Sequence, residues 1–294
     1  MRPDLPSGRP DVSPEALTLV LAAGLVHASW NLILKRSEDP LIVGAASLLA
    51  GSLLFAPVLV GALPVPRAVW PYVSTSALVM VAYYGVLGHA YRRGDFSLVY
   101  PVARGSAPAL IALWATLFLG ERPSPRGLSG IGLILLGLVV LGGGPLWIRR
   151  RDWKNLAPGL FPAFVVAVLI SIYSVVDGAG VRLWEPAPYV VLTFALGGGM
   201  LVPALWLRDP PRVKQVVRRS WRSVVVIAGL TLLAYSMVLR AYQIAPIAYA
   251  GAAREIGIVF GALAGWLILG ERFGGFRTVG AVLVFAGIGV LATA

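Results

Sequence analysis

Residues 90–122 read AYRRGDFSLVYPVARGSAPALIALWATLFLGER, and residues 241–272 read AYQIAPIAYAGAAREIGIVFGALAGWLILGER. These two stretches decide the fold, because they match each other along most of their length. Each ends in LGER, and each carries an arginine 17 residues before the glutamate of that tetrapeptide. Two apolar segments of low complexity can also match by chance. An internal duplication explains the shared tetrapeptide and the shared arginine better.

The duplication extends beyond the two stretches. A shift of 151 positions holds at the start of the match, and a shift of 150 holds after a one-residue deletion. The matched pairs are Tyr84 with Tyr235, Ala90 with Ala241, Tyr91 with Tyr242, Arg104 with Arg254, Glu121 with Glu271 and Gly130 with Gly280.

Composition places the whole chain in a membrane. The sequence is 58% hydrophobic and 13% charged, with a mean hydropathy of +0.81, whereas a soluble domain has about one quarter charged residues. At about 20 residues per membrane-spanning helix, apolar runs between charged or Pro/Gly-rich breaks predict ten spans and leave no room for a soluble catalytic domain. The expected spans are 15–35, 41–62, 69–91, 97–119, 127–146, 156–178, 187–207, 222–243, 246–269 and 275–293.

Ten spans in two copies give five spans per copy. Because five is odd, the two copies cross the bilayer in opposite directions, which is the inverted-repeat plan of secondary transporters with a substrate site near the midplane. We therefore expect an all-α membrane protein of ten transmembrane helices in two inverted five-helix repeats. The expected boundaries are a flexible tail at 1–14, a first repeat at 15–146 and a second repeat at 156–293.

Three features of this pattern resemble a known family. They are HASWNLILKRS at His27–Ser37, the repeated LGER, and the Gly-rich segments at 127–146 and 275–293. In these the chain resembles EamA-type members of the drug/metabolite transporter superfamily. The resemblance implies ten helices in two inverted repeats and export of small metabolites such as amino acids, with exporters of aromatic amino acids of the YddG type as one branch.

Charged residues inside predicted spans usually mark pathways or buried pairs. Arg104 and Arg254 lie near the middle of the fourth and ninth spans, and Glu255 follows Arg254. Either arginine could anchor a substrate carboxylate or phosphate by a bidentate contact. The alternatives are a structural Arg104–Glu255 pair, or arginines that reach toward the nearer interface.

Aromatic residues suggest the walls of a pathway. Tyr84 and Tyr91 are seven residues apart, so they share one helical face, and Tyr235 and Tyr242 repeat the spacing. Tyrosine offers a flat ring and a hydroxyl to an amphiphilic substrate, although an interfacial aromatic belt is the competing role. The expected substrate-binding residues are Trp30, Asn31, Tyr83, Tyr84, His89, Tyr100, Arg104, Tyr173, Tyr235, Tyr242 and Arg254.

The remaining residue types limit the chemistry. The chain has two histidines, His27 and His89, and no cysteine, so we expect no metal site and no cofactor. Either histidine could carry protons in a coupled cycle, although a histidine bonded to a backbone carbonyl in a packed bundle is commoner. The GxxxG stripe at Gly257, Gly261 and Gly265 favours an internal helix contact, which leaves a monomer or a weak homodimer.

The positive charge is uneven along the chain. The formal net charge is +12, which in a soluble protein would suggest nucleic acid. Here ten of the basic residues lie in the segments 149–154 and 208–222, as expected for loops that face the cytoplasm and anionic lipid. No nucleic-acid partner is therefore expected. The charge count puts both termini outside the cytoplasm, whereas the family resemblance implies the opposite orientation.

These observations favour one function. We expect a secondary transporter in the inner membrane of a bacterium that exports small amphiphilic metabolites, with amino acids as the first candidates. The alternatives are a flippase for a lipid carrier or sugar conjugate and, less favoured, an intramembrane enzyme. No GxSxG, HExxH or P-loop motif occurs in the sequence, which weakens the enzyme and the ATP-driven alternatives.

Overall fold

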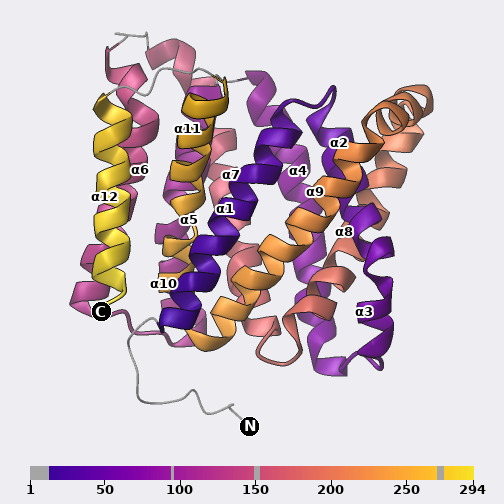
Figure 1. Cartoon of the computed structure of the whole chain (residues 1–294), viewed down its shortest axis with the longest axis horizontal. Helices are drawn as coiled ribbons and strands as arrows, with labels where there is room; N and C mark the ends of the chain where they lie inside the picture. Colours follow the sequence, from indigo (N-terminus) through magenta and orange to yellow (C-terminus); the bar gives the residue numbers. More distant parts are fainter. Residues whose placement is uncertain (1–12, 94–95, 149–152, 270–274) are drawn as a thin grey trace.

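The computed structural model describes residues 13–93, 96–148, 153–269 and 275–294, and every regular element in that part of the chain is a helix (Figure 1). The elements are α1 (Pro14–Lys35), α2 (Pro40–Leu54), α3 (Ala56–Gly61), the short 3₁₀ helix η1 (Arg67–Val69), α4 (Trp70–Arg93), α5 (Phe96–Leu119), α6 (Pro125–Ile148), α7 (Trp153–Gly180), α8 (Pro186–Arg208), α9 (Pro210–Ile244), α10 (Ile247–Ala253), α11 (Ile256–Leu269) and α12 (Gly275–Leu291). The expected tail lies outside the described residues up to position 12.

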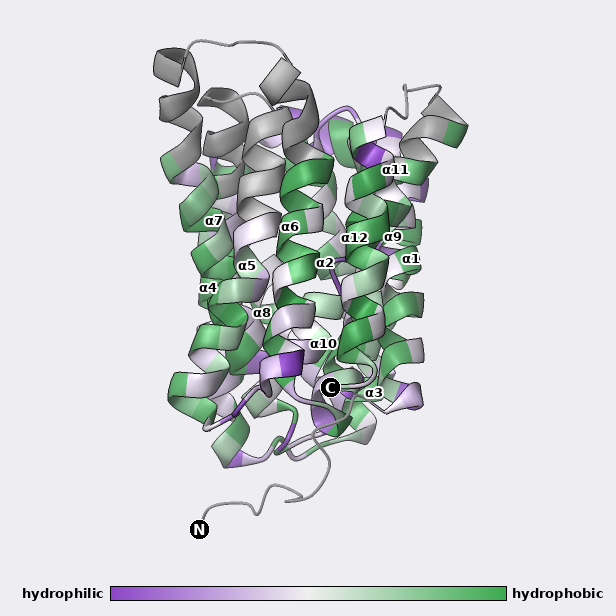
Figure 2. Cartoon of the chain, turned by 90° about the vertical axis from the view of Figure 1, so that its left-hand side faces the viewer, coloured by the Kyte–Doolittle hydropathy of each residue, from purple (hydrophilic) through white to green (hydrophobic). Residues whose placement is uncertain are grey.

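The outer surface of the bundle is apolar. Large hydrophobic side chains such as Leu207, Phe161 and Phe118 are 83%, 75% and 73% exposed, and most of the ribbon of α6 and α12 is hydrophobic (Figure 2). In the described part of the chain, four helical segments are long and apolar enough to cross a membrane, namely Pro14–Leu34, Phe161–Gly180, Pro186–Arg208 and Pro210–Ile244. Such a surface suits lipid, so the all-α membrane class expected from composition agrees with the structure.

The helices α6 and α12 pack antiparallel through glycines. A Cβ atom added at Gly137 would lie 2.7 Å from the carbonyl oxygen of Gly280, and one at Gly287 would lie 2.7 Å from that of Gly130. Only glycine permits this close approach of two helix backbones. As position numbers rise from Gly130 to Gly137 in α6, those of their partners fall from Gly287 to Gly280, so the two helices run in opposite directions.

The segment before the expected eighth span is a helix, and its prediction as a loop was wrong. Helix α9 begins at Pro210 and bends at Ser220, where φ is −104° and ψ is 15°. Val213 and Val216 are buried against Ile42 and Val43 of α2. This apolar stripe at a spacing of three residues stabilises an amphipathic helix, and the many arginines that suggested a loop occupy its other faces.

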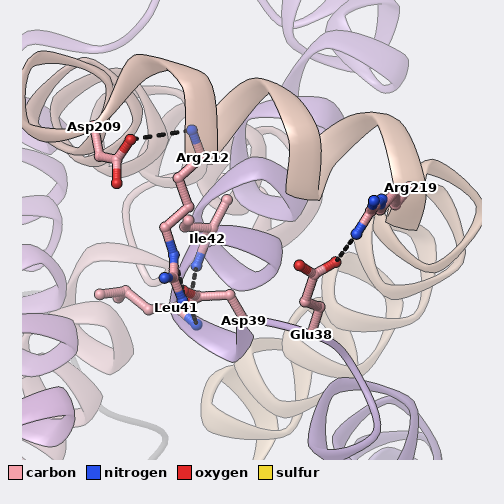
Figure 3. A network of polar contacts seen from close by, with 7 residues as sticks. All are labelled: Glu38, Asp39, Leu41, Ile42, Asp209, Arg212 and Arg219. Atoms are coloured by element: carbon pink, nitrogen blue, oxygen red, sulfur yellow. Dashed lines mark hydrogen bonds and ion pairs between the residues drawn. The ribbon is translucent and has the colours of Figure 1, made fainter.

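Ion pairs near the surface connect this first part of α9 to the turn between α1 and α2 (Figure 3). Arg212 pairs with Asp39 at 2.9 Å, and Arg219 lies 3.8 Å from Glu38. Asp39 also begins α2, because its side chain accepts hydrogen bonds from the backbone N–H groups of Leu41 and Ile42 at 3.2 Å, which helix N-termini otherwise leave unsatisfied.

Two of the expected spans are each divided into two helices. The second becomes α2 and α3, which meet at Phe55, and the ninth becomes α10 and α11, which meet at Arg254 and Glu255. At the second break the backbone N–H of Glu255 bonds the carbonyl of Ala252, three residues back instead of four. The interruption places two charged side chains inside the bundle, where a broken helix can line a polar site.

Candidate functional site

A small group of polar residues lies inside the otherwise apolar bundle. Asp177 of α7 is fully buried, and Arg254 and Glu255, at the junction of α10 and α11, are 8% and 1% exposed. Burying such charges costs several kcal/mol per ion unless they are paired and hydrogen-bonded. Their partners therefore define the site.

Asp177 is held by two tyrosines. The Tyr189 hydroxyl of α8 donates to Oδ1 of Asp177 at 2.7 Å, and the Tyr235 hydroxyl of α9 donates to Oδ2. Each carboxylate oxygen thus accepts a hydrogen bond from a different helix. The Asp177 carboxylate therefore connects α7 to both α8 and α9.

Arg254 is held loosely by comparison. Its Nη1 lies 3.4 Å from both the Ser174 and the Tyr242 hydroxyl oxygens, and its Nη2 lies 3.4 Å from Oε1 of Glu255. These distances are long for charge-assisted hydrogen bonds, which are normally 2.7–2.9 Å. Its buried Nε has no hydrogen-bond partner among the described residues. The guanidinium therefore has spare donor capacity for an anionic group.

Tyrosine rings form a continuous cluster beside these charges. Tyr83 contacts Tyr84 of α4 and Tyr173 of α7 with ring centroids 5.3 and 6.3 Å apart, and Tyr173 contacts Tyr235 at 6.2 Å. The rings meet edge to face, an arrangement that aromatic pairs prefer. Tyr235 also stacks on Phe194 of α8 at 6.0 Å. These four tyrosines are partly exposed, although they lie in the interior of the bundle.

Trp30 and Asn31 of α1 lie in a different group of residues. Trp30 packs with the apolar cluster that joins α2 to the first part of α9, and its ring lies 4.7 Å from that of His27. The Asn31 amide donates to the backbone carbonyl of His27 at 2.8 Å. Among the described contacts, none joins these two residues to the tyrosine cluster.

The structure thus brings together six of the eleven expected residues: Tyr83, Tyr84, Tyr173, Tyr235, Tyr242 and Arg254. The side chains of His89, Tyr100 and Arg104 lie outside the described residues, and so does the expected Arg104–Glu255 pair. Asp177 was not expected at the site. One signal in the sequence points to it, because Asn31 lies nine residues before Pro40, which begins α2, and Asp177 lies nine residues before Pro186, which begins α8.

The glutamate of the first LGER has a structural role. Glu121, in the connection between α5 and α6, accepts hydrogen bonds from the backbone N–H groups of Ile247 and Ala248 at 2.8 and 3.0 Å, and Arg182 pairs with it at 3.2 Å. The carboxylate therefore satisfies N–H groups at the start of α10 that have no partner within the helix. In the same region the Tyr249 hydroxyl accepts a hydrogen bond from the backbone N–H of Ser124 at 2.8 Å.

A metal centre is not apparent from the side chains. Within the described part of the chain, no three His, Cys, Asp or Glu residues are grouped closely enough to hold an ion.

Comparison with known proteins identifies the family. The sequence profile of the EamA-like transporter family matches residues 15–143 and again residues 157–293. The Pseudopaline exporter CntI of Pseudomonas aeruginosa, from strains UCBPP-PA14 and PAO1, is 25% identical over 292 residues, which cover 93% of this chain and 94% of the relative. A solved crystal structure has the same fold, with a TM-score of 0.75 and 20% identity over 95% of this chain and 96% of that one. The resemblance found in the sequence is confirmed: the protein is an integral membrane protein, and the chain belongs to the EamA-like transporter family.

Proposed function

We propose that the protein is a secondary transporter that exports small amphiphilic metabolites, with amino acids as its first substrate class. The single observation that carries this proposal is Arg254, a buried guanidinium with spare donors that lies next to the tyrosine cluster. An arginine fork matches a carboxylate, and the tyrosine rings offer flat surfaces to the apolar end of the same molecule. Family membership and the related pseudopaline exporters support the transport of a small molecule.

We further propose that the chain crosses the membrane ten times as two inverted repeats, 15–146 and 156–293. On this proposal α2 and α3 together form the second span, and α10 and α11 the ninth. Two findings support it. The family profile matches the chain twice, and the contacts of the two halves correspond, since α1 packs on α9 as α7 packs on α4, while α2 packs on α8 and α6 on α12.

Transport would then follow from rocking of one half against the other around the tyrosine cluster. The antiparallel contact between α6 and α12 fits this scheme, because these helices hold equivalent places in the two halves. The chain positions of its glycines agree as well. Gly130 and Gly137 correspond to Gly280 and Gly287 at the shift of 150. The two helices therefore meet through equivalent glycines, one pair from each half.

Tyr84→Ala and Tyr235→Ala are each expected to raise the KM for transport about 2–10-fold, because each removes an aromatic surface worth about 0.5–1.5 kcal/mol to a stacked substrate. The measurement is uptake of labelled amino acids into liposomes that contain the purified variants. Trp221→Ala is the matched control, since Trp221 is an exposed aromatic residue of α9 outside the cluster. Unchanged transport by both tyrosine variants would refute the assignment of this cluster to the pathway.

We also propose an orientation, in the inner membrane of a bacterium, with the first residues of α9 in the cytoplasm. Helix α1 begins and α12 ends at one end of the bundle, and the basic start of α9 lies at the other (Figure 1). Arg212, Lys214 and Arg218 are exposed there, as the positive-inside rule expects of a cytoplasmic end. A reporter that is active only in the cytoplasm, fused to the C-terminus, is expected to give no signal; strong activity would reverse the orientation.

A further inference from the structure

We propose that Asp177 is the proton-binding residue that couples substrate export to the entry of protons; this inference rests on the proposed transport function. Among the buried carboxylates described, Asp177 is the one whose hydrogen bonds come from uncharged hydroxyl groups. The others are bonded by a cation or by the backbone N–H groups at a helix terminus. An ionised carboxylate in such a place is costly, and taking up a proton removes that cost. The ligand of this site is therefore a proton.

The surroundings provide a partner for each protonation state. The ionised carboxylate accepts the hydroxyl hydrogens of Tyr189 and Tyr235, one on each oxygen. The hydroxyl of Ser76 on α4 is fully buried and lies beside Asp177, where it can donate a third hydrogen bond to the ionised carboxylate. A protonated Asp177 has one O–H to donate, and a serine hydroxyl can accept as well as donate, so Ser76 offers a partner to this state too.

Protonation changes how strongly α7 is held to its neighbours. Ionised Asp177 can accept hydrogen bonds from hydroxyl groups on three helices, Tyr189 of α8, Tyr235 of α9 and Ser76 of α4. Helix α4 belongs to the first proposed repeat and the others to the second. Because hydrogen bonds to an ionised acceptor are about twice as strong as those to a neutral one, binding of a proton would weaken the contact between α4 and α7, and its loss would restore it, so that the contact between the two proposed repeats is biased by protonation. The proton enters from water on one side and leaves to water on the other, and no covalent bond of the substrate changes.

The other ionisable groups near Asp177 are few. On α7 itself there is Tyr173, and on the helices packed against α7 they are Tyr72, Tyr83 and Tyr84 of α4, Tyr242 of α9 beside Tyr235, and Arg254 with Glu255 at the junction of α10 and α11. On α5, residues 105–119 contain no ionisable side chain, and side chains 96–104 lie outside the described part. Arg254 contacts Glu255 at 3.4 Å, and its positive charge also acts on Asp177 without forming an ion pair with it.

The first test is transport in liposomes with and without a pH gradient. Wild-type protein is expected to accumulate labelled amino acid against its gradient when protons flow in the opposite direction. Asp177→Asn is expected to lose this accumulation while the exchange of labelled for unlabelled substrate continues, and Asp177→Glu should restore part of it. Glu38→Gln, which alters an exposed carboxylate at the end of the bundle, is the matched control and should behave as wild type.

Two results of this test would overturn the proposal. Accumulation by Asp177→Asn equal to that of wild type would show that protons are carried elsewhere. Loss of exchange together with accumulation in a folded Asp177→Asn protein would show that Asp177 binds the substrate.

A second measurement needs no substrate and separates this proposal from the proposed function. Infrared difference spectra of purified protein, recorded during a pH titration, report the C=O stretch of protonated carboxyl groups. A titrating band present in wild type and in Glu38→Gln is expected to be missing from Asp177→Asn. If wild type exchanges no amino acid but the band is still missing from Asp177→Asn, the proposed substrate class fails and the proton site stands. If Asp177→Asn keeps every titrating band of the wild type, the proton site fails.

Discussion

Glu121→Ala is expected to lower the free energy of unfolding by about 3–5 kcal/mol, the usual cost of removing one partner of a buried ion pair. The side chain of Glu121 is 8% exposed and pairs with Arg182, which is 24% exposed. The same carboxylate satisfies the backbone N–H groups of Ile247 and Ala248 at the start of α10. The substitution leaves these two donors and one partly buried cation without an acceptor.

Equilibrium unfolding in mixed detergent micelles measures this loss. Glu15→Ala is the matched control, because Glu15 forms a solvent-exposed pair with Arg240 at 3.8 Å, and exposed pairs contribute little to stability. Glu121→Gln should lie between the two, since an amide keeps one acceptor oxygen for the helix terminus but no charge for Arg182. Equal stability of the Glu121→Ala and Glu15→Ala proteins would contradict the role given to the LGER glutamate.

Arg254→Lys is expected to lower the kcat/KM of transport by about 10–100-fold for substrates with a free carboxylate. A hydrogen bond to a charged group is worth about 1.5–3 kcal/mol, and each 1.4 kcal/mol corresponds to a factor of ten. Lysine keeps the positive charge beside Glu255 but lacks the planar fork that binds both oxygens of a carboxylate. The charge balance of the interior therefore stays the same while the proposed anchor is lost.

The informative readout is the comparison of each amino acid with its amide. The amide lacks the carboxylate, so its transport should be affected much less by Arg254→Lys. Arg126→Lys, a change of the same type at an exposed position, controls for general effects of the substitution. An equal loss for acid and amide would show that Arg254 acts on the structure of the bundle and not on the substrate.

Part of this site was predictable from the sequence, because it is repeated there. Tyr84 and Tyr235 occupy matching places in the two copies, and the structure puts both in one aromatic cluster through Tyr83 and Tyr173. Arg254 stood out as a charge in the middle of an apolar span. Both signals are local, either a spacing or a residue type that does not suit its neighbours.

Asp177 and Glu121 were harder to predict, since their roles depend on contacts distant in sequence. The donors of Asp177 come 12 and 58 positions later, and its place at the end of an apolar run resembles that of an ordinary loop residue. Glu121 bonds residues 126 and 127 positions away. For α9 the error was different: a high density of arginine suggested a loop, but Val213 and Val216 supply enough buried apolar surface to fold the segment as an amphipathic helix.

Substrate-induced thermal stabilisation of the purified protein tests the central claim most directly. A ligand that binds only the folded state raises its unfolding temperature, so a panel of amino acids, sugars, nucleotides and lipids can be compared in one experiment. We predict that amino acids, aromatic ones above all, raise the unfolding temperature of wild type, and that this rise is absent from the Tyr84→Ala/Tyr235→Ala double variant. Stabilisation by lipids or sugar nucleotides alone, or an amino acid effect that the double variant retains in full, would contradict the account.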